Sequence, residues 1–130
     1  MTRLEYRVPY ADTDQMGVVY YANYFVYFER VRNELLRSRG FPYSRMEEEG
    51  IGLPVLESHC QHRSPARYDD LLTLTGEFQI LTPARVKASC CVWRDSTELA
   101  RGHTVHAVID LASGRPKRMP ESMIQWFSED

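Results

Sequence analysis

An aromatic segment at residues 20–28 constrains the fold more than any other part of the sequence. Six of its nine residues are aromatic, and apolar side chains recur at helical spacing from Tyr21 to Leu36. Gly40 and Pro42 then supply a helix stop. Because the first half of this predicted helix is apolar on nearly every side, we expect the rest of the chain to wrap around it. The polar side chains of the second half are expected to face solvent, namely Glu29, Arg30, Arg32, Asn33, Glu34 and Arg37.

Most of the remaining chain alternates between apolar and polar residues, which is typical of strands with one buried face. Between Leu71 and Ile80, for example, Leu72 and Leu74 take even positions whereas Thr73 takes an odd one. We predict strands at residues 4–10, 53–62, 71–80, 86–93 and 99–109, turns at 11–17, 95–97 and 113–114, a helical turn at 44–49, and either a helical turn or a strand at 121–127.

This order of elements predicts an α+β fold in which one antiparallel sheet wraps around one long central helix. We expect residues 1–130 to form a single domain, because a chain of 130 residues has no room for a second one. Such a sheet has free edges and an open second face. Pairing of protomers edge to edge would complete the fold, so we expect a homodimer or a homotetramer.

Composition excludes several classes of partner. A formal net charge of −2 is too close to neutral for a general nucleic-acid surface. No apolar run approaches the roughly 20 residues of a membrane-spanning helix, and the N-terminus lacks the pattern of a secretory signal. Three cysteines, two of them adjacent, suit buried thiols better than disulfides. We therefore expect a cytoplasmic protein that acts on a small molecule.

The four histidines occur as two spaced pairs, His59-x-x-His62 and His103-x-x-His106. Residues three apart on a strand point to opposite faces, so neither pair chelates one ion from a single strand. We expect no metal site and no other cofactor.

Residues 10–25 contain the features most suggestive of chemistry. Asp12, Asp14 and Gly17 immediately precede the long predicted helix, whose first backbone N–H groups lack internal partners and favour an anion or a developing oxyanion. Thioester hydrolysis needs such an oxyanion site and a carboxylate that attacks the carbonyl or activates water. The same residues also suit a turn and a helix cap, and spacing alone does not choose between Asp12 and Asp14.

The segment at 10–25 resembles the signature of the 4-hydroxybenzoyl-CoA thioesterase family, including its Tol-Pal-associated acyl-CoA thioesterase branch. The shared pattern is an aromatic residue, two alternating Asp, Gly, a Val-Val-Tyr-like run and Asn-Tyr. Residues 64–71, Ser-Pro-Ala-Arg-Tyr-Asp-Asp-Leu, resemble the turn that leads into a strand of that family, and Pro120 agrees with it. The resemblance implies a hotdog fold and hydrolysis of an acyl-CoA thioester, or of the corresponding carrier-protein thioester.

The resemblance also implies roles for individual residues. Asp14 would be the nucleophile or general base, and the backbone N–H of Tyr21 would polarise the thioester carbonyl. Some relatives carry His at the position of Tyr21, and a phenol does not replace an imidazole in moving protons at neutral pH, so Tyr21 has a main-chain role only. Asp12 would stabilise the turn. Candidates for substrate binding are Gly17, Tyr10, which either lines the acyl pocket or packs as a first-strand aromatic, and Arg67, Arg85 and Lys87, which could bind the CoA phosphates.

Two other functions remain open from the residues alone. Hydration of an enoyl thioester relies, in hotdog relatives, on a histidine motif near the helix, and no histidine precedes His59 here. A non-catalytic module that binds an acyl thioester or a protein would use Asp12 and Asp14 only to build the turn.

Overall fold

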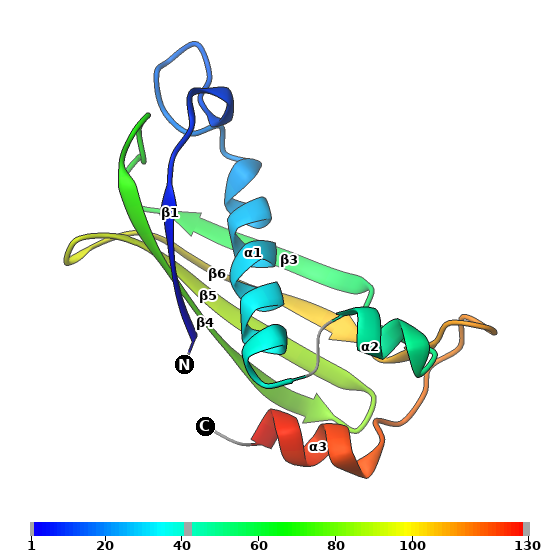
Figure 1. The fold of residues 1–130 in the computed structure, drawn as a ribbon. Coiled ribbons are helices and arrows are strands. Elements are labelled where there is room, and N and C mark those ends of the chain that lie inside the picture. Colours follow the sequence, from blue (N-terminus) through cyan, green and yellow to red (C-terminus); the bar gives the residue numbers. More distant parts are fainter. Residues whose placement is uncertain (1, 41–42, 129–130) are drawn as a thin grey trace.

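The computed structural model describes residues 2–40 and 43–128, and it contains an antiparallel sheet with helices on one of its faces (Figure 1). Five strands follow the order β1-β4-β5-β6-β3, and β2 pairs with β7 separately. The strands are β1 (Thr2–Arg7), β2 (Ile51–Gly52), β3 (Val55–His62), β4 (Leu71–Thr82), β5 (Arg85–Arg94), β6 (Thr97–Ala107) and β7 (Ile109–Asp110). The helices are the 3-10 helix η1 (Tyr10–Asp12), α1 (Asn23–Ser38), α2 (Tyr43–Glu48) and α3 (Glu121–Ser128).

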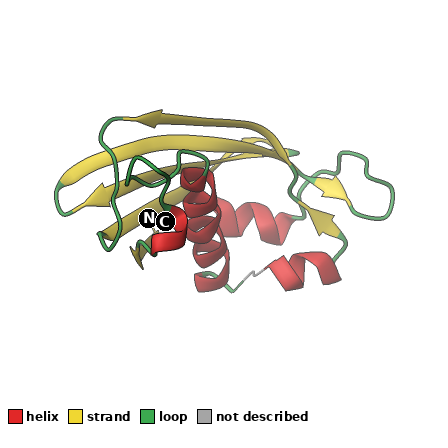
Figure 2. Cartoon of the chain, turned by 90° about the horizontal axis from the view of Figure 1, so that it is seen from above, coloured by secondary structure: helices red, strands yellow, loops and turns green. Residues whose placement is uncertain are grey.

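Helix α1 lies against the inner face of the sheet, and Figure 2 shows the helices below a curved sheet. Its buried residues Tyr24, Tyr27, Phe28 and Val31 pack against apolar side chains of the strands. Burial of one such side chain contributes about 1.5–3 kcal/mol, so this contact is a major source of stability. The predicted α+β arrangement, one antiparallel sheet wrapped around a long helix, is confirmed.

The end of the chain adds a second cluster of buried residues beneath the same sheet. Residues 121–127, which the sequence left open between helix and strand, belong to helix α3. Met123, Trp126 and Phe127 are buried there, and Phe78 of β4 packs against them. The alternation of apolar and polar residues along β4 therefore continues past the part of the strand that α1 covers, where its apolar side chains pack against α3.

Several predicted boundaries differ from the structure for local reasons. The first strand ends at Arg7 and not at Tyr10, because Pro9 has no N–H for the ladder and η1 begins at Tyr10. Helix α1 begins at Asn23, two residues after the predicted start, since Tyr21 and Ala22 form a turn. The predicted strand at 99–109 is divided between β6 and β7.

Two expectations about helix α1 are wrong. Its entry is not wrapped on all sides, because Tyr20 and Tyr21 remain 45% and 64% exposed. Arg32 was expected in solvent, but only 6% of it is exposed. Its guanidinium reaches Thr104 Oγ1 at 3.4 Å and Glu29 at 3.9 Å, so a sheet hydroxyl and one distant carboxylate are what compensate its burial.

No helix in the described part of the chain has the length and apolar character that crossing a membrane requires. The three cysteines are free thiols. Burial raises the pKa of Cys90 to about 12, which disfavours its thiolate form and agrees with a packing role.

His106 on β6 is buried, with 1% of its surface exposed. Its Nδ1 lies 2.9 Å from the carbonyl oxygen of Leu53, and its Nε2 lies 2.8 Å from Thr104 Oγ1. A carbonyl only accepts, so Nδ1 carries the proton and Nε2 accepts from the Thr104 hydroxyl. Burial lowers the pKa of His106, the Leu53 carbonyl opposes this effect, and the nearby Arg32 adds to it.

We predict that His106 makes the protein less stable in mild acid. Because its folded-state pKa is lowered, the neutral ring contributes stability that is present above the ordinary pKa of about 6.5 and is lost as pH falls through the folded value. The free energy of unfolding should fall by up to about 1.4 kcal/mol per pH unit from this group. Urea unfolding at several pH values between 7.5 and 5 gives the free energy of unfolding as a function of pH. This free energy should fall less steeply with decreasing pH for His106→Gln than for the wild type, and an equal pH dependence would contradict the prediction.

Candidate active site

Asp12 ties the loop before helix α1 to its surroundings. Its Oδ2 accepts hydrogen bonds from the hydroxyls of Tyr6 at 2.7 Å and Tyr27 at 2.8 Å. Its backbone oxygen accepts from the N–H of Tyr20 and from the side-chain amide of Asn23, both at 2.9 Å. Burial, followed by the bond to Asp12, raises the pKa of Tyr27, so this phenol stays protonated as a donor. These contacts support the structural role expected for Asp12.

Asp14 lies in a tight turn and keeps one carboxylate oxygen free. Its Oδ1 accepts from the N–H of Met16 at 2.9 Å, and its backbone bonds to Gly17 and Val18. Gly17 adopts a positive φ of 78°, a conformation that favours glycine. Within residues 2–40 and 43–128, Oδ2 of Asp14 has no hydrogen-bond or ion-pair partner. The turn thus orients the carboxylate and leaves Oδ2 available for chemistry.

The entry of helix α1 presents a backbone donor without a partner. The N–H groups of Asn23, Tyr24 and Phe25 bond to the carbonyls of residues 20, 21 and 22 respectively. By contrast, the N–H groups of Tyr21 and Ala22 bond to no group in the described chain, and no side chain caps the helix. An unpaired N–H at a helix start favours a negatively charged oxygen. The structure therefore shows the backbone feature that an oxyanion site requires.

A pocket of about 290 Å³ adjoins this helix entry. Tyr24 lines it and packs edge-on against His62, with ring centroids 4.9 Å apart. The Tyr24 hydroxyl accepts a hydrogen bond from the N–H of Ala66 at 3.1 Å, which joins the two walls. The pocket is lined by Val18, Val19, Tyr21, Tyr24, His62, Arg63, Ser64 and Pro65.

The structure brings only part of the predicted site together in one protomer. Tyr21 lines the pocket, whereas Asp14 belongs to the adjoining turn. The pKa of Tyr20 is raised by the Tyr21 phenol first, then by burial, and least by the Asp14 carboxylate, so this charge lies within electrostatic range of the aromatic pair. Gly17 shapes the Asp14 turn and does not line the pocket.

Tyr10 does not pack as a first-strand aromatic. It lies in η1, is 76% exposed and contacts the ring of Tyr68 edge-on at 5.8 Å. That interpretation failed because it assumed a strand through residue 10.

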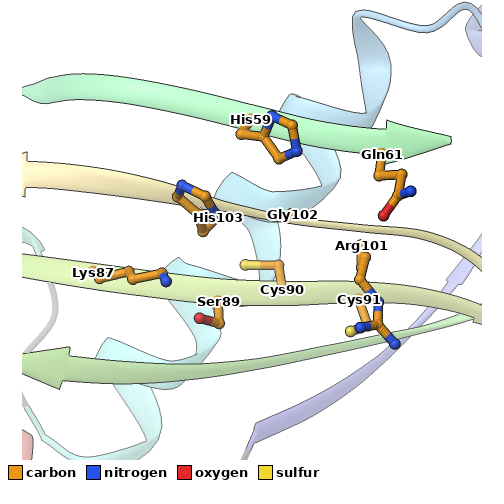
Figure 3. Close-up of a pocket in the computed structure, with 9 residues that line it drawn as sticks. All are labelled: His59, Gln61, Lys87, Ser89, Cys90, Cys91, Arg101, Gly102 and His103. Carbon is orange, nitrogen blue, oxygen red and sulfur yellow. The ribbon is translucent and has the colours of Figure 1, made fainter.

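The basic candidates are dispersed. The exposed Arg67 is next to the pocket wall, because its backbone forms an isolated β-bridge with Val18, which lines the pocket. The pocket residue His62 on β3 pairs with Ala100 on β6, and Ala100 pairs with Val92 on β5. Arg85 lies seven residues before Val92 on β5, so it is roughly 23 Å along the strand from the level of the pocket. Lys87 lines a hollow on the outer face of the sheet, the face opposite helix α1 and the pocket (Figure 3). The fold of this chain therefore does not bring Arg85 and Lys87 to the pocket.

Sequence reasoning did not assign His62, Arg63 and Ser64 to the site. Arg63 is the basic residue that lines the pocket, and its guanidinium lies 3.5 Å from Glu98. A sequence signal for this part of the site was present, because Ser64 begins the segment 64–71 that resembles the family turn. This segment lies opposite Tyr21 because the backbone of Val19 pairs with that of Ala66, and spacing along the chain does not reveal that pairing.

Comparisons with known proteins identify the family and the fold of the chain. Residues 8–127 match the thioesterase-like superfamily. The acyl-CoA thioester hydrolase YbgC of Escherichia coli O6:H1 is 30% identical over 124 residues, which cover 95% of this chain and 92% of that protein. The 1,4-dihydroxy-2-naphthoyl-CoA hydrolase of Synechococcus sp. (strain CC9605) is 26% identical over 126 residues, covering 92% and 85%. The crystal structure of a hypothetical protein from Thermus thermophilus has a TM-score of 0.93 at 33% identity and covers 98% of both chains. The hotdog fold implied by the sequence is confirmed.

Proposed function

This chain belongs to the thioesterase-like superfamily and is an acyl-CoA thioester hydrolase, and from that premise we propose that Asp14 and the backbone N–H of Tyr21 are its catalytic groups. The observation that carries the proposal is the unpartnered N–H of Tyr21 at the start of α1, where it adjoins an open pocket. The free Oδ2 of Asp14, on the same loop, supports it.

In the proposed reaction the Tyr21 N–H donates to the thioester carbonyl oxygen. One well-aimed donor of this kind lowers the barrier by roughly 3–4 kcal/mol, because its hydrogen bond strengthens as negative charge develops on the oxygen. Asp14 acts through Oδ2, since Oδ1 is occupied by Met16. It either attacks the carbonyl carbon, expels the thiol and leaves an anhydride that water hydrolyses, or takes a proton from the attacking water. Both routes yield the free acid and the thiol.

We propose that the pocket beside the helix entry binds the acyl group. Its wall combines the side chains of Val18, Val19 and Tyr24 with those of His62 and Ser64, which suits an aryl or a short to medium acyl chain. The motif at 10–25 supports a place for the protein near the 4-hydroxybenzoyl-CoA thioesterases and their Tol-Pal-associated branch. Arg63 also lines this pocket, where its guanidinium lies 3.5 Å from Glu98.

We propose that two protomers pair along β3, which forms one edge of the sheet. Val55 and Leu56 on this strand are about half exposed, and an unpaired edge with apolar side chains favours association. Antiparallel pairing would place the Val55 end of one strand beside the His62 end of the other. Such pairing continues the sheet with its faces aligned, so Arg85 and Lys87 of the second protomer remain on the outer face, opposite the pocket. Sedimentation equilibrium should give the mass of a dimer or a tetramer, and a monomer at micromolar concentration would refute the pairing.

A panel of thioesters tests the proposed function. Purified protein should release free thiol from aryl-CoA and short to medium acyl-CoA esters, measured with a thiol reagent, with carrier-protein esters assayed in parallel. Addition of water to an enoyl-CoA without thiol release would instead indicate a hydratase. Binding of CoA esters without turnover across the panel would indicate a non-catalytic module.

A further inference from the structure

The outer face of the sheet carries two histidines on neighbouring strands. His59 on β3 is directly in register with His103 on β6, and the next strand places Ser89 opposite His103. Figure 3 shows both imidazoles on the same side of the sheet, with helix α1 behind the strands. The two His-x-x-His pairs of the sequence are thus divided by the sheet, so that one histidine of each pair meets on this face.

The distance between the two rings suits a shared ion. Their centroids are 5.5 Å apart, with an angle of 32° between the ring planes. Two imidazoles that bind one tetrahedral ion at about 2.0–2.1 Å through nitrogen place their ring centres roughly 5 Å apart. His59 is exposed and His103 is partly buried, and the observed separation of their rings is close to this value.

The ring nitrogens are also available. In the part of the chain that the structure describes, neither His59 nor His103 forms a hydrogen bond or an ion pair through its ring. The neutral imidazole is the form that ligates metals.

Space permits an ion to bind, whereas the nearby charges act in both directions: the Lys87 ammonium opposes a cation, Glu57 favours one, and Arg101 is paired with Glu98. Both histidines line a hollow of about 430 Å³ that also includes Lys87 and Ser89. They line a second hollow of about 520 Å³ together with Glu57. No group of three or more His, Cys, Asp or Glu side chains in the described residues is arranged around one point, so water would complete the coordination.

We propose that His59 and His103 chelate one divalent transition-metal ion of the imidazole-preferring class, Zn²⁺, Cu²⁺ or Ni²⁺. The bound ion links the edge strand β3 to β6. Pairing of protomers along β3 uses backbone groups and leaves the side chains of this face in place, so the ion and the proposed dimer are compatible. The site is separate from the candidate active site, because His62, which lines the active-site pocket, is three residues from His59 on β3 and therefore points to the opposite face.

Metal titration of the full chain without an affinity tag tests this proposal. Isothermal titration with ZnCl₂ should give one ion per chain, and electron paramagnetic resonance with CuCl₂ should show nitrogen coupling from two imidazoles. His59→Asn and His103→Asn should each weaken binding by roughly tenfold or more. His62→Asn is the matched control, since it removes an exposed histidine from the other face of the same strand, and it should bind as tightly as the wild type.

Thermal unfolding gives an independent readout. Zinc should raise the midpoint of the wild type and of His62→Asn, because an ion that binds only the folded chain stabilises it. It should leave the midpoint of His59→Asn and His103→Asn unchanged. Absence of binding to the wild type, or equal loss of binding in all three variants, would overturn the proposal.

Discussion

Asp14→Asn is expected to lower kcat by roughly 10³-fold, equivalent to about 4 kcal/mol of barrier. The amide cannot attack the thioester or accept a proton from water at neutral pH. It does retain an oxygen for the Met16 N–H, which is the contact that Asp14 makes through Oδ1. The free energy of unfolding should therefore stay within about 0.5 kcal/mol of the wild type. Thiol release and urea unfolding measure the two quantities on the same preparation.

Two matched substitutions control for this result. Asp95→Asn makes the same change in the exposed β5–β6 turn, and it should preserve both activity and stability. Asp12→Asn should lower stability by about 1–2 kcal/mol, because a neutral oxygen is a weaker acceptor for the Tyr6 and Tyr27 hydroxyls. Near-normal activity of Asp14→Asn on every substrate of the panel would remove the carboxylate from the mechanism.

The parts of the fold that the sequence predicted depend on local periodicity. The aromatic stripe identified α1 because a helix buries one side of its own repeat, and alternation identified β4 for the same reason. The boundaries depended on backbone hydrogen bonds, which composition does not report. The turn at Tyr21 and Ala22 is an example, since its unpartnered N–H is the feature on which the proposed chemistry depends.

The parts that could not be predicted depend on pairing between distant segments. His59 meets His103 only because β3 and β6 pair in a particular register, whereas spacing along one strand argued against a shared ion. Arg32 follows the polar pattern of an exposed helix face, yet its guanidinium is buried and donates a hydrogen bond to Thr104 of β6. In both cases a contact across the sheet determined the environment of the side chain.

Gly102 of β6 pairs with Cys60 of β3, where an added side chain has no room, and its replacement is expected to have the largest effect on stability. A Cβ at this position would collide with the backbone oxygen of His59 and would lie 2.8 Å from the Phe28 ring. The backbone oxygen belongs to a paired strand and cannot rotate away, so the edge strand must shift. We expect Gly102→Ala to lower the free energy of unfolding by about 3 kcal/mol or more. The thermal midpoint should fall by roughly 10 °C.

Gly76→Ala provides the matched control, because it adds the same methyl group to a neighbouring part of the same sheet. Its Cβ would meet the two Val31 methyl groups at 3.3 Å. These atoms end a side chain, and a shift of a few tenths of an ångström relieves the contact without moving a strand, so the loss should remain below about 1 kcal/mol. Urea unfolding of both variants, followed by circular dichroism, compares the two costs. Equal losses would show that the approach of β3 to β6 is looser than the structure indicates, and would also weaken the register that places His59 beside His103.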